Sequence, residues 1–172
     1  MWNIGKIKKY LPRPVLIQLV NSLVTSRLDY GNSLLYGSPT SLLRKLQLVQ
    51  NSAARLITGT KRMDHITPVL KELHWLPIEQ RIVFKVLLLT YRAIHGISPT
   101  YISDLVRRYT PVRSLRSGEA LQLCQSQTRC RYGDNAFTSS APRLWNALPL
   151  SVKSASTVES FKRKLKVQVT CS

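Results

Sequence analysis

The chain has 172 residues, 44% of them hydrophobic, which is enough for one folded domain or two small ones. It contains 26 Lys and Arg against 8 Asp and Glu, a net charge of +18. The excess is spread along the chain, because residues up to Thr110 carry 16 basic and 5 acidic side chains and the rest carry 10 and 3. This charge favours nucleic acid as the partner over an anionic membrane or an acidic protein.

Neither a membrane span nor a secretory signal is expected. The longest apolar run, Val86 to Leu89, is far shorter than a bilayer requires. The basic segment Met1–Tyr10 has no apolar run after it and no cleavage site of small residues. Three cysteines are an odd number, typical of reduced thiols. We therefore expect an intracellular protein, cytoplasmic or nuclear.

The first predicted helix covers residues 13–30, because its apolar residues fall on one helical face: Leu16, Leu19, Val20, Leu23 and Val24. Gly31 and the segment Gly37–Pro39 then interrupt the pattern. A second helix is predicted over 40–58, with Thr40 or Ser41 as its N-cap and Gly59 as its C-cap. Its expected buried stripe is Leu42, Leu46, Val49, Ala53 and Leu56, and its polar residues, Gln50 among them, flank or oppose that stripe.

Three more helices are expected before Thr110. A short one covers 68–75, with Thr67 as its cap and Pro68 in its first turn. A long one covers 78–95 and ends at His95-Gly96. Its inward residues are expected to be Ile82, Val83, Val86, Leu87, Leu89, Tyr91 and Ile94. The third covers 100–109.

The pattern changes after Thr110. Alternation of apolar and polar residues over 120–124, and more weakly over 128–132, predicts two short strands. Within 137–148, Pro142 is expected to start a short helix. The capping box Ser156 to Glu159 predicts a final helix to about Val169. The predicted fold is mainly α, a helical bundle with a small two-stranded β element in its last third.

No catalytic or metal centre is predicted. The eight carboxylates are scattered, with no two adjacent or one residue apart, whereas general acid/base or two-metal chemistry needs them clustered. His65, His74 and His95 lie at least nine residues apart with no cysteine near them, so they lack zinc-ligand spacing. We expect no cofactor and no enzymatic activity.

The candidate functional residues are basic ones, which would contact phosphates while neighbouring tyrosines could stack on bases. For any single residue a solvated surface role is the more ordinary reading, but a net charge of +18 needs a counter-charge. The predicted phosphate-binding set is Arg44, Lys45, Arg55, Lys61, Arg62, Arg107, Arg108, Arg129, Arg131, Lys162, Arg163, Lys164 and Lys166.

Several strings resemble one family in order along nearly the whole chain, from about residue 4 to residue 167. They include SRLDYGNSLLYG at 26–37, LQLVQNSAARLITG at 46–59, DHITPVL at 64–70, LHWLP at 73–77 and APRLWNALP at 141–149. The family is the reverse transcriptases of non-LTR retrotransposons of the CR1/L2/jockey type. Two departures are Gly31, where many relatives have Cys, and Cys130, where an aliphatic residue is usual.

The resemblance implies a C-terminal part of such a polymerase. Its palm and endonuclease would lie upstream, and no Tyr-x-Asp-Asp motif occurs here. Residues 1–38 would be a thumb-like helical remnant, 39–110 a helical bundle and 111–172 a basic α+β module. The implied role is to grip template RNA or a primer–template duplex. Alternatives are a helical module that docks on the missing palm through 40–58, 78–95 and an exposed face at 16–24, or a transposon fragment without function.

Overall fold

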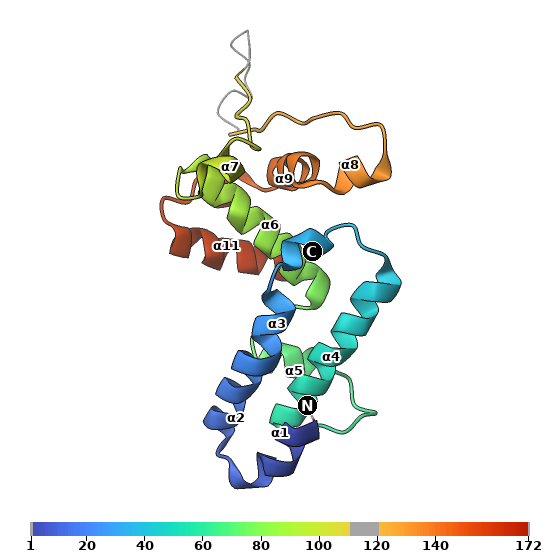
Figure 1. Cartoon of the computed structure of the whole chain (residues 1–172). Coiled ribbons are helices and arrows are strands. Elements are labelled where there is room, and N and C mark those ends of the chain that lie inside the picture. Colours follow the sequence, from blue (N-terminus) through green and yellow to red (C-terminus); the bar gives the residue numbers. More distant parts are fainter. Residues whose placement is uncertain (1, 111–120, 172) are drawn as a thin grey trace. The chain divides into compact units, whose positions relative to one another are not determined.

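The computed structural model describes residues 2–110 and 121–171, and these are mainly helical. The chain divides into two compact units, Met1–Arg81 and Ile82–Ser172, which are treated separately below (Figure 1). The long helix α6, Ile78–Ile94, begins in the first unit and continues into the second. No described helix is both long enough and apolar enough to cross a membrane.

The first unit is built from short helices around one long one. Its helices are α1 (Trp2–Ile7), α2 (Arg13–Val20), α3 (Ser26–Asp29), α4 (Thr40–Thr58), α5 (Thr67–Glu72) and the start of α6. The helix predicted over 13–30 is confirmed, with a π-helical stretch at Asn21–Thr25 joining α2 to α3. 3-10 turns at Lys8–Tyr10 and Asn32–Leu35 complete the unit. The range predicted for α4 is confirmed, and Gly59 follows it with φ +77°, a left-handed conformation that glycine adopts without strain. The N-cap predicted at Thr40 or Ser41 is wrong, because the helix already includes both residues and Pro39 occupies the cap position without a side-chain hydrogen bond.

Helix α4 turns inward a face that only partly overlaps the predicted one, since Ala53 of the predicted stripe is buried and Leu56 packs against the core. Its buried residues are Gln50, Ala53, Ala54 and Ile57, whereas Leu42 and Val49 from the predicted stripe are each 40% exposed. Ala53 and Ile57 pack with Ile4 of α1 and with Leu16 and Val20 of α2. Ala54 packs with Val69 and Leu70 of α5 in a second cluster. The core of the unit therefore forms where α4 meets α1, α2 and α5.

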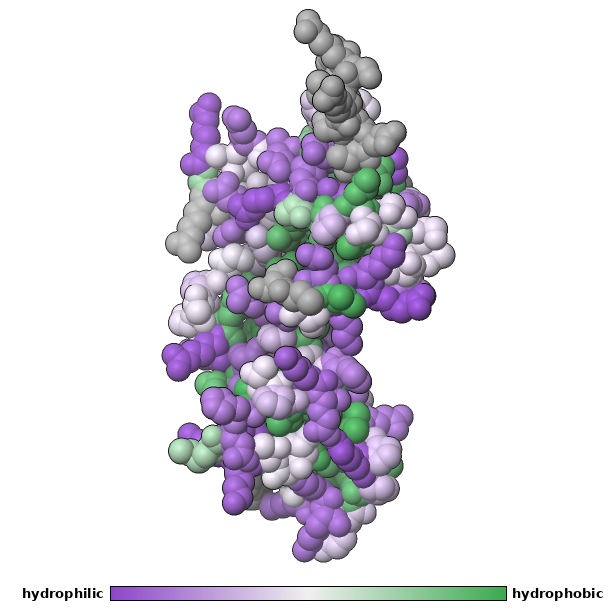
Figure 2. All heavy atoms as spheres, turned by 180° about the vertical axis from the view of Figure 1, so that it is seen from behind, coloured by the Kyte–Doolittle hydropathy of each residue, from purple (hydrophilic) through white to green (hydrophobic). Residues whose placement is uncertain are grey.

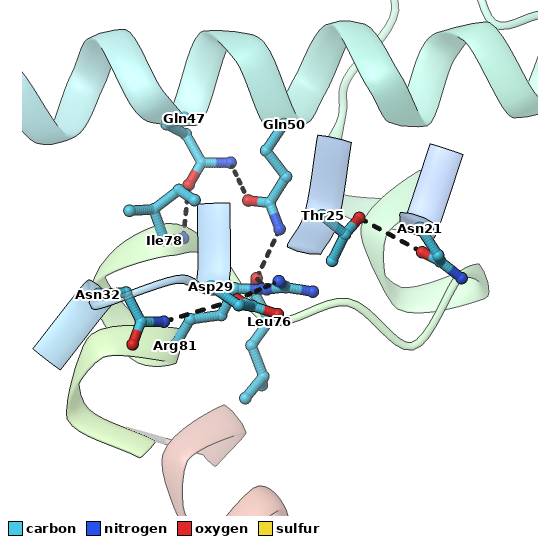
Figure 3. A network of polar contacts seen from close by, with 9 residues as sticks. All are labelled: Asn21, Thr25, Asp29, Asn32, Gln47, Gln50, Leu76, Ile78 and Arg81. Carbon is cyan, nitrogen blue, oxygen red and sulfur yellow. Dashed lines mark hydrogen bonds and ion pairs between the residues drawn. The ribbon is translucent and has the colours of Figure 1, made fainter. Parts of the chain in front are cut away.

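A buried amide explains the rotated face of α4. Gln50 is 1% exposed, and its Nε2 donates to the Leu76 carbonyl at 2.8 Å while its Oε1 accepts from Gln47 Nε2 at 2.9 Å (Figure 3). The Gln47 Oε1 accepts the backbone N–H of Ile78 at 2.9 Å, so α4 holds the start of α6 through two side chains. Burying a polar group is tolerated when its hydrogen bonds are made, and here they are.

An ion pair ties α3 to the same junction. Arg81 Nη1 contacts Asp29 Oδ1 at 2.7 Å, and Arg81 Nε donates to the Leu76 carbonyl at 3.1 Å. The Arg81 side chain is 14% exposed, and its guanidinium lies over the Trp75 ring. Figure 3 shows Asn32 pointing its amide at the same carboxylate, at 3.5 Å. The string SRLDYGN thus supplies structural contacts in this unit.

The second unit packs around three aromatic rings. Its helices are the rest of α6, then α7 (Thr100–Ser103), α8 (Arg131–Asn135), α9 (Phe137–Asn146), α10 (Leu150–Lys153) and α11 (Val158–Cys171). Tyr91 of α6 stacks on Phe161 of α11 with centroids 4.3 Å apart, and Trp145 of α9 lies 5.9 Å from Phe161. Each ring is at most 1% exposed, so these three helices share one core. The predicted helix at 100–109 is shorter than expected and ends at Ser103.

The two-stranded element predicted in the last third is wrong for the residues that the structure describes, which include no strand. Ala120 of the first predicted strand lies outside them, and the rest forms one isolated antiparallel bridge, Arg108 with Leu123. On its other edge, Leu123 exchanges two hydrogen bonds of 2.9 Å with the side-chain amide of Asn146. That amide takes the place of a neighbouring strand. The second predicted strand is replaced by α8, which begins at Arg131.

Three other helix starts also differ from the prediction. Pro142 lies inside α9 and does not begin it. Because proline has no N–H, the Thr138 carbonyl four residues earlier loses its helical partner, and the Ser126 hydroxyl donates to it at 3.3 Å. At α11 the expected cap shifts by one residue, since Thr157 Oγ1, and not Ser156, accepts from the Ser160 N–H at 3.2 Å. The cap predicted at Thr67 is also wrong, because α5 already includes that residue.

Candidate nucleic-acid interface

Each unit carries a large positive charge of its own. Met1–Arg81 contains 12 basic and 4 acidic residues and Ile82–Ser172 contains 14 and 4, so the net charges are +8 and +10. The face in Figure 2 is mostly hydrophilic, with hydrophobic residues in small separate patches. A field of this sign and size raises the local concentration of polyanions.

The last helix presents the most regular cationic face. Phe161, Leu165 and Val169 recur every four residues and are at most 7% exposed, so they fix the inward side of α11. Arg163 and Lys166 therefore lie on the outward side and are exposed. Within the described part of the chain, the side chain of neither residue makes a hydrogen bond or an ion pair. Both are positioned to meet an anion from solution.

The other two predicted cations of α11 already have partners. Lys162 forms an ion pair with Glu159 one turn earlier, with 2.8 Å between Nζ and Oε1. Lys164 Nζ donates to the Ser151 carbonyl at 2.8 Å and so ties α11 to α10. A phosphate would have to compete with these contacts, which makes Lys162 and Lys164 weaker candidates than Arg163 and Lys166.

The charges of three cations act on one carboxylate at the start of α11. The hydrogen bond and charge of Lys162 lower the pKa of Glu159, and the charges of Arg163 and Arg92 lower that pKa further. Arg92 lies in α6 between buried Tyr91 and Ala93, and its Nε is a buried donor without a hydrogen-bond partner among the described residues. The predicted set omits Arg92. Arg92 and Glu159 are 67 residues apart in the sequence, so only the packing of α6 beside α11 reveals that Arg92 acts on Glu159.

The remaining arginines of the second unit have different surroundings. Arg107 and Arg108 follow α7 and are exposed, and Arg108 Nη2 donates to the Ile94 carbonyl at 3.0 Å. Arg129 is exposed just before α8. Arg131 begins α8, and its side chain lies outside the described structure. The structure therefore brings together the predicted cations of α11, but it does not join Arg129 to them through any contact.

In the first unit, the predicted cations occupy α4 and the segment after it. Arg44 and Lys45 are exposed in the first turns of α4, and Lys61 and Arg62 are exposed beyond its end. Arg55 has a structural contact, because Nε donates to the Lys61 carbonyl at 3.1 Å and Nη2 to the Asp64 carbonyl at 2.9 Å. Arg55 thereby shapes the loop that carries Lys61 and Arg62.

Three of the described carboxylates form ion pairs. Asp29 pairs with Arg81, Glu72 with Arg13 and Glu159 with Lys162. Among the residues that the structure describes, no three His, Cys, Asp or Glu side chains gather as a metal site. Cys124 and Cys130 are exposed and form no disulfide.

Comparison with known proteins adds no relative. No family model, curated protein or solved structure matches this chain. The resemblance to non-LTR reverse transcriptases therefore stays a prediction from the strings quoted above.

Proposed function

We propose that this chain is a non-catalytic nucleic-acid-binding module that grips phosphates with little dependence on base sequence. The observation that carries the proposal is the outward face of α11, where Arg163 and Lys166 are exposed and where Arg163, Lys162 and Arg92 act on the Glu159 carboxylate. Arginine and lysine in such a position bind phosphate oxygens and release counterions. The large net charge of each unit supports the same role.

The resemblance gives the proposal a biological setting. As the C-terminal part of a retrotransposon reverse transcriptase, the chain would hold template RNA or a primer–template duplex for a polymerase centre on another segment. Its partners would be RNA, an RNA–DNA hybrid or duplex DNA. In this setting the chain would bind the nucleic acid, and the separate polymerase centre would carry out the chemistry.

The first test is fluorescence anisotropy of the purified chain with labelled single-stranded RNA, duplex DNA and an RNA–DNA hybrid across a salt series. We expect binding that weakens steeply as salt rises, and the ranking of the three ligands identifies the preferred form. Weak binding to all three at low salt would reject the proposal.

A pair of double variants tests the α11 face itself. Arg163→Gln with Lys166→Gln should lower the slope of log K against log salt by about 1.4 for single-stranded RNA, two contacts at about 0.7 each. The matched control is Lys9→Gln with Lys71→Gln, which removes the same charge from the first unit outside the predicted set. Equal losses in both pairs would mean that net charge, and not this face, drives binding.

A second candidate function is docking onto another protein. Leu42, Leu48 and Val49 of α4 are 40%, 58% and 40% exposed, and apolar side chains grouped on one helix favour association. The face expected at 16–24 is a weaker candidate, because Leu16 and Val20 are buried within the first unit. A docking module should self-associate in sedimentation velocity and bind RNA weakly, and Leu48→Gln should reduce that self-association.

A further inference from the structure

The second unit contains a cavity of about 280 Å³ whose lining does not include the outward cations of α11. It lies between the end of α6, the bridged segments around Arg108 and Leu123, Trp145 of α9, and the residues that join α10 to α11. Its volume is near the lower end of the range for small-molecule sites. It therefore suits one flat ring system and not a larger ligand.

The floor of the cavity is apolar and its rim is polar. Leu123 and Trp145 line it and are at most 3% exposed, so they form the floor. His95, Ser154 and Ser156 line the same cavity and are exposed, so they form the rim. A ligand that enters here would bury an apolar face against the floor and keep its polar groups at the rim.

Hydrogen bonds hold the floor of the cavity in place. Trp145 Nε1 donates to the Leu121 carbonyl at 2.8 Å, and Leu123 is fixed by its two bonds to Asn146. Leu121 has φ +46°, a backbone conformation that leucine rarely adopts, so surrounding contacts must hold it. Lys153, which also lines the cavity, belongs to this scaffold, since its Nζ donates to the Asn146 carbonyl at 3.1 Å. The cavity is therefore preformed.

The rim offers both hydrogen-bond donors and hydrogen-bond acceptors. The hydroxyls of Ser154 and Ser156 can each donate and accept. Burial and the charge of Arg108 lower the pKa of His95, so its ring is neutral at pH 7 and carries one donor and one acceptor. The same ring is held against Tyr91, with the two centroids 4.2 Å apart. Such a rim can pair with the mixed donors and acceptors at the edge of a nucleobase.

One cation at the cavity is placed to bind a phosphate. Arg108 and Leu123 are partners in the antiparallel bridge, so their side chains lie on the same face, and both line the cavity. Arg108 Nη2 donates to the Ile94 carbonyl at 3.0 Å, which uses one of the five N–H donors of the guanidinium. Because Arg108 is exposed, its other donors can meet a phosphate that stays outside the cavity.

We propose that this cavity receives one unpaired nucleobase of a single-stranded RNA, with the neighbouring phosphate on Arg108. The base would lie against Leu123 and Trp145, with its polar edge at the rim. An apolar floor accepts any base, so binding stays tolerant of sequence. A base in a duplex would first have to leave its pair, so the cavity favours single strands. The inference rests on the proposed nucleic-acid function and adds this preference to it.

A free nucleotide tests the cavity without the polymer. The chain has three tryptophans, and only Trp145 lines the cavity, so its indole N–H signal reports binding in two-dimensional NMR of the full chain. Adenosine monophosphate (AMP) should shift that signal, whereas ribose 5-phosphate, which has the phosphate but no base, should not. Arg108→Gln should weaken AMP binding about tenfold, because a charge-assisted hydrogen bond is lost. Lys85→Gln, outside the cavity, should leave AMP binding unchanged.

A bulky residue at the rim tests the base of a strand. Ser156→Phe should close the cavity, and Ser151→Phe places the same ring on the exposed surface of α10, outside the cavity. In the anisotropy assay, Ser156→Phe should weaken the binding of single-stranded RNA about tenfold, the loss of one stacked base. Its duplex DNA binding should stay unchanged, as should both affinities of Ser151→Phe. Retained dispersion of the amide spectrum checks that each variant folds; if Ser156→Phe does not, the AMP titrations carry the test.

The outcomes separate this inference from the proposed function. The inference alone is overturned if the chain binds RNA but AMP does not move the Trp145 signal, or if ribose 5-phosphate moves it equally. It is also overturned if folded Ser156→Phe binds single-stranded RNA as Ser151→Phe does; an AMP shift would then mean that the cavity takes a free nucleotide. Weak binding of all three nucleic acids at low salt would reject the proposed function, and the inference with it.

Discussion

The substitution Tyr91→Phe, which removes one oxygen atom, tests the packing that holds α11 in place. The Tyr91 hydroxyl donates to the Ala155 carbonyl at 2.8 Å, across 64 residues of sequence, and Tyr91 and Ala155 are 1% and 4% exposed. Ala155 lies just before α11, so this bond anchors the segment from which the cationic helix begins. Tyr91→Phe removes the donor and leaves the ring to stack on Phe161.

The expected loss of stability comes from the carbonyl that Tyr91→Phe leaves without a hydrogen-bond donor. The ring and its contacts stay, so no large cavity forms, and the cost comes from a buried carbonyl without its partner. Such a group costs about 1–3 kcal/mol of unfolding free energy. We therefore expect Tyr91→Phe to destabilise the second unit by about 1–3 kcal/mol.

The measurement is urea unfolding followed through the indole NMR signal of Trp145, which reports on the second unit alone. Tyr132→Phe is the matched control, because Tyr132 is 90% exposed in the same unit and its change should stay within about 0.5 kcal/mol. If Tyr91→Phe is no more destabilising than this control, the buried hydrogen bond does not hold Ala155 in solution.

Three further predictions concern other buried or charged groups. Gln50→Ala should destabilise the first unit by about 2–4 kcal/mol, from lost hydrogen bonds and a cavity, in urea unfolding followed at the Trp75 indole. The lowered pKa of His95 means that its charged form is disfavoured in the fold, so the second unit should lose stability as pH falls from about 7.5 through 6.5, the ordinary pKa of histidine, and below. His95→Asn should flatten that pH dependence of the melting temperature, and an unchanged slope would exclude His95 as its source. Glu159→Gln removes the carboxylate from the cationic cluster and should tighten RNA binding about two- to threefold at low salt in the anisotropy assay.

Helix positions were predictable where the proline and glycine residues that bound helices agree with the spacing of the apolar residues. The ends of α4 follow from Pro39 and Gly59, and the end of α6 follows from Gly96, which has φ +66°. The inward face of α4 was not predictable from its own sequence. Gln50 is buried because the Leu76 carbonyl, 26 residues away, accepts its amide hydrogen bond, and an apolar scale counts Gln50 as a surface residue.

The candidate site also has features that follow from nearby residues in the sequence and features that depend on residues far along the chain. The outward position of Arg163 and Lys166 follows from the spacing of Phe161 and Leu165 and is readable in the sequence. The predicted two-stranded element failed because of a side chain, since the Asn146 amide occupies the edge of Leu123 that a second strand would have used. The burial of Lys153 was also not foreseen, because it accompanies a hydrogen bond from its Nζ to the Asn146 carbonyl of α9.

The proline inside α9 has a consequence for anyone who would re-engineer this chain. Replacing Pro142 with alanine looks like a simple gain in helix propensity. The new N–H, however, would compete with the Ser126 hydroxyl for the Thr138 carbonyl. A more regular helix would thus release the neighbouring loop that carries Arg129, and protease cleavage in that loop should become faster as the helix itself becomes firmer.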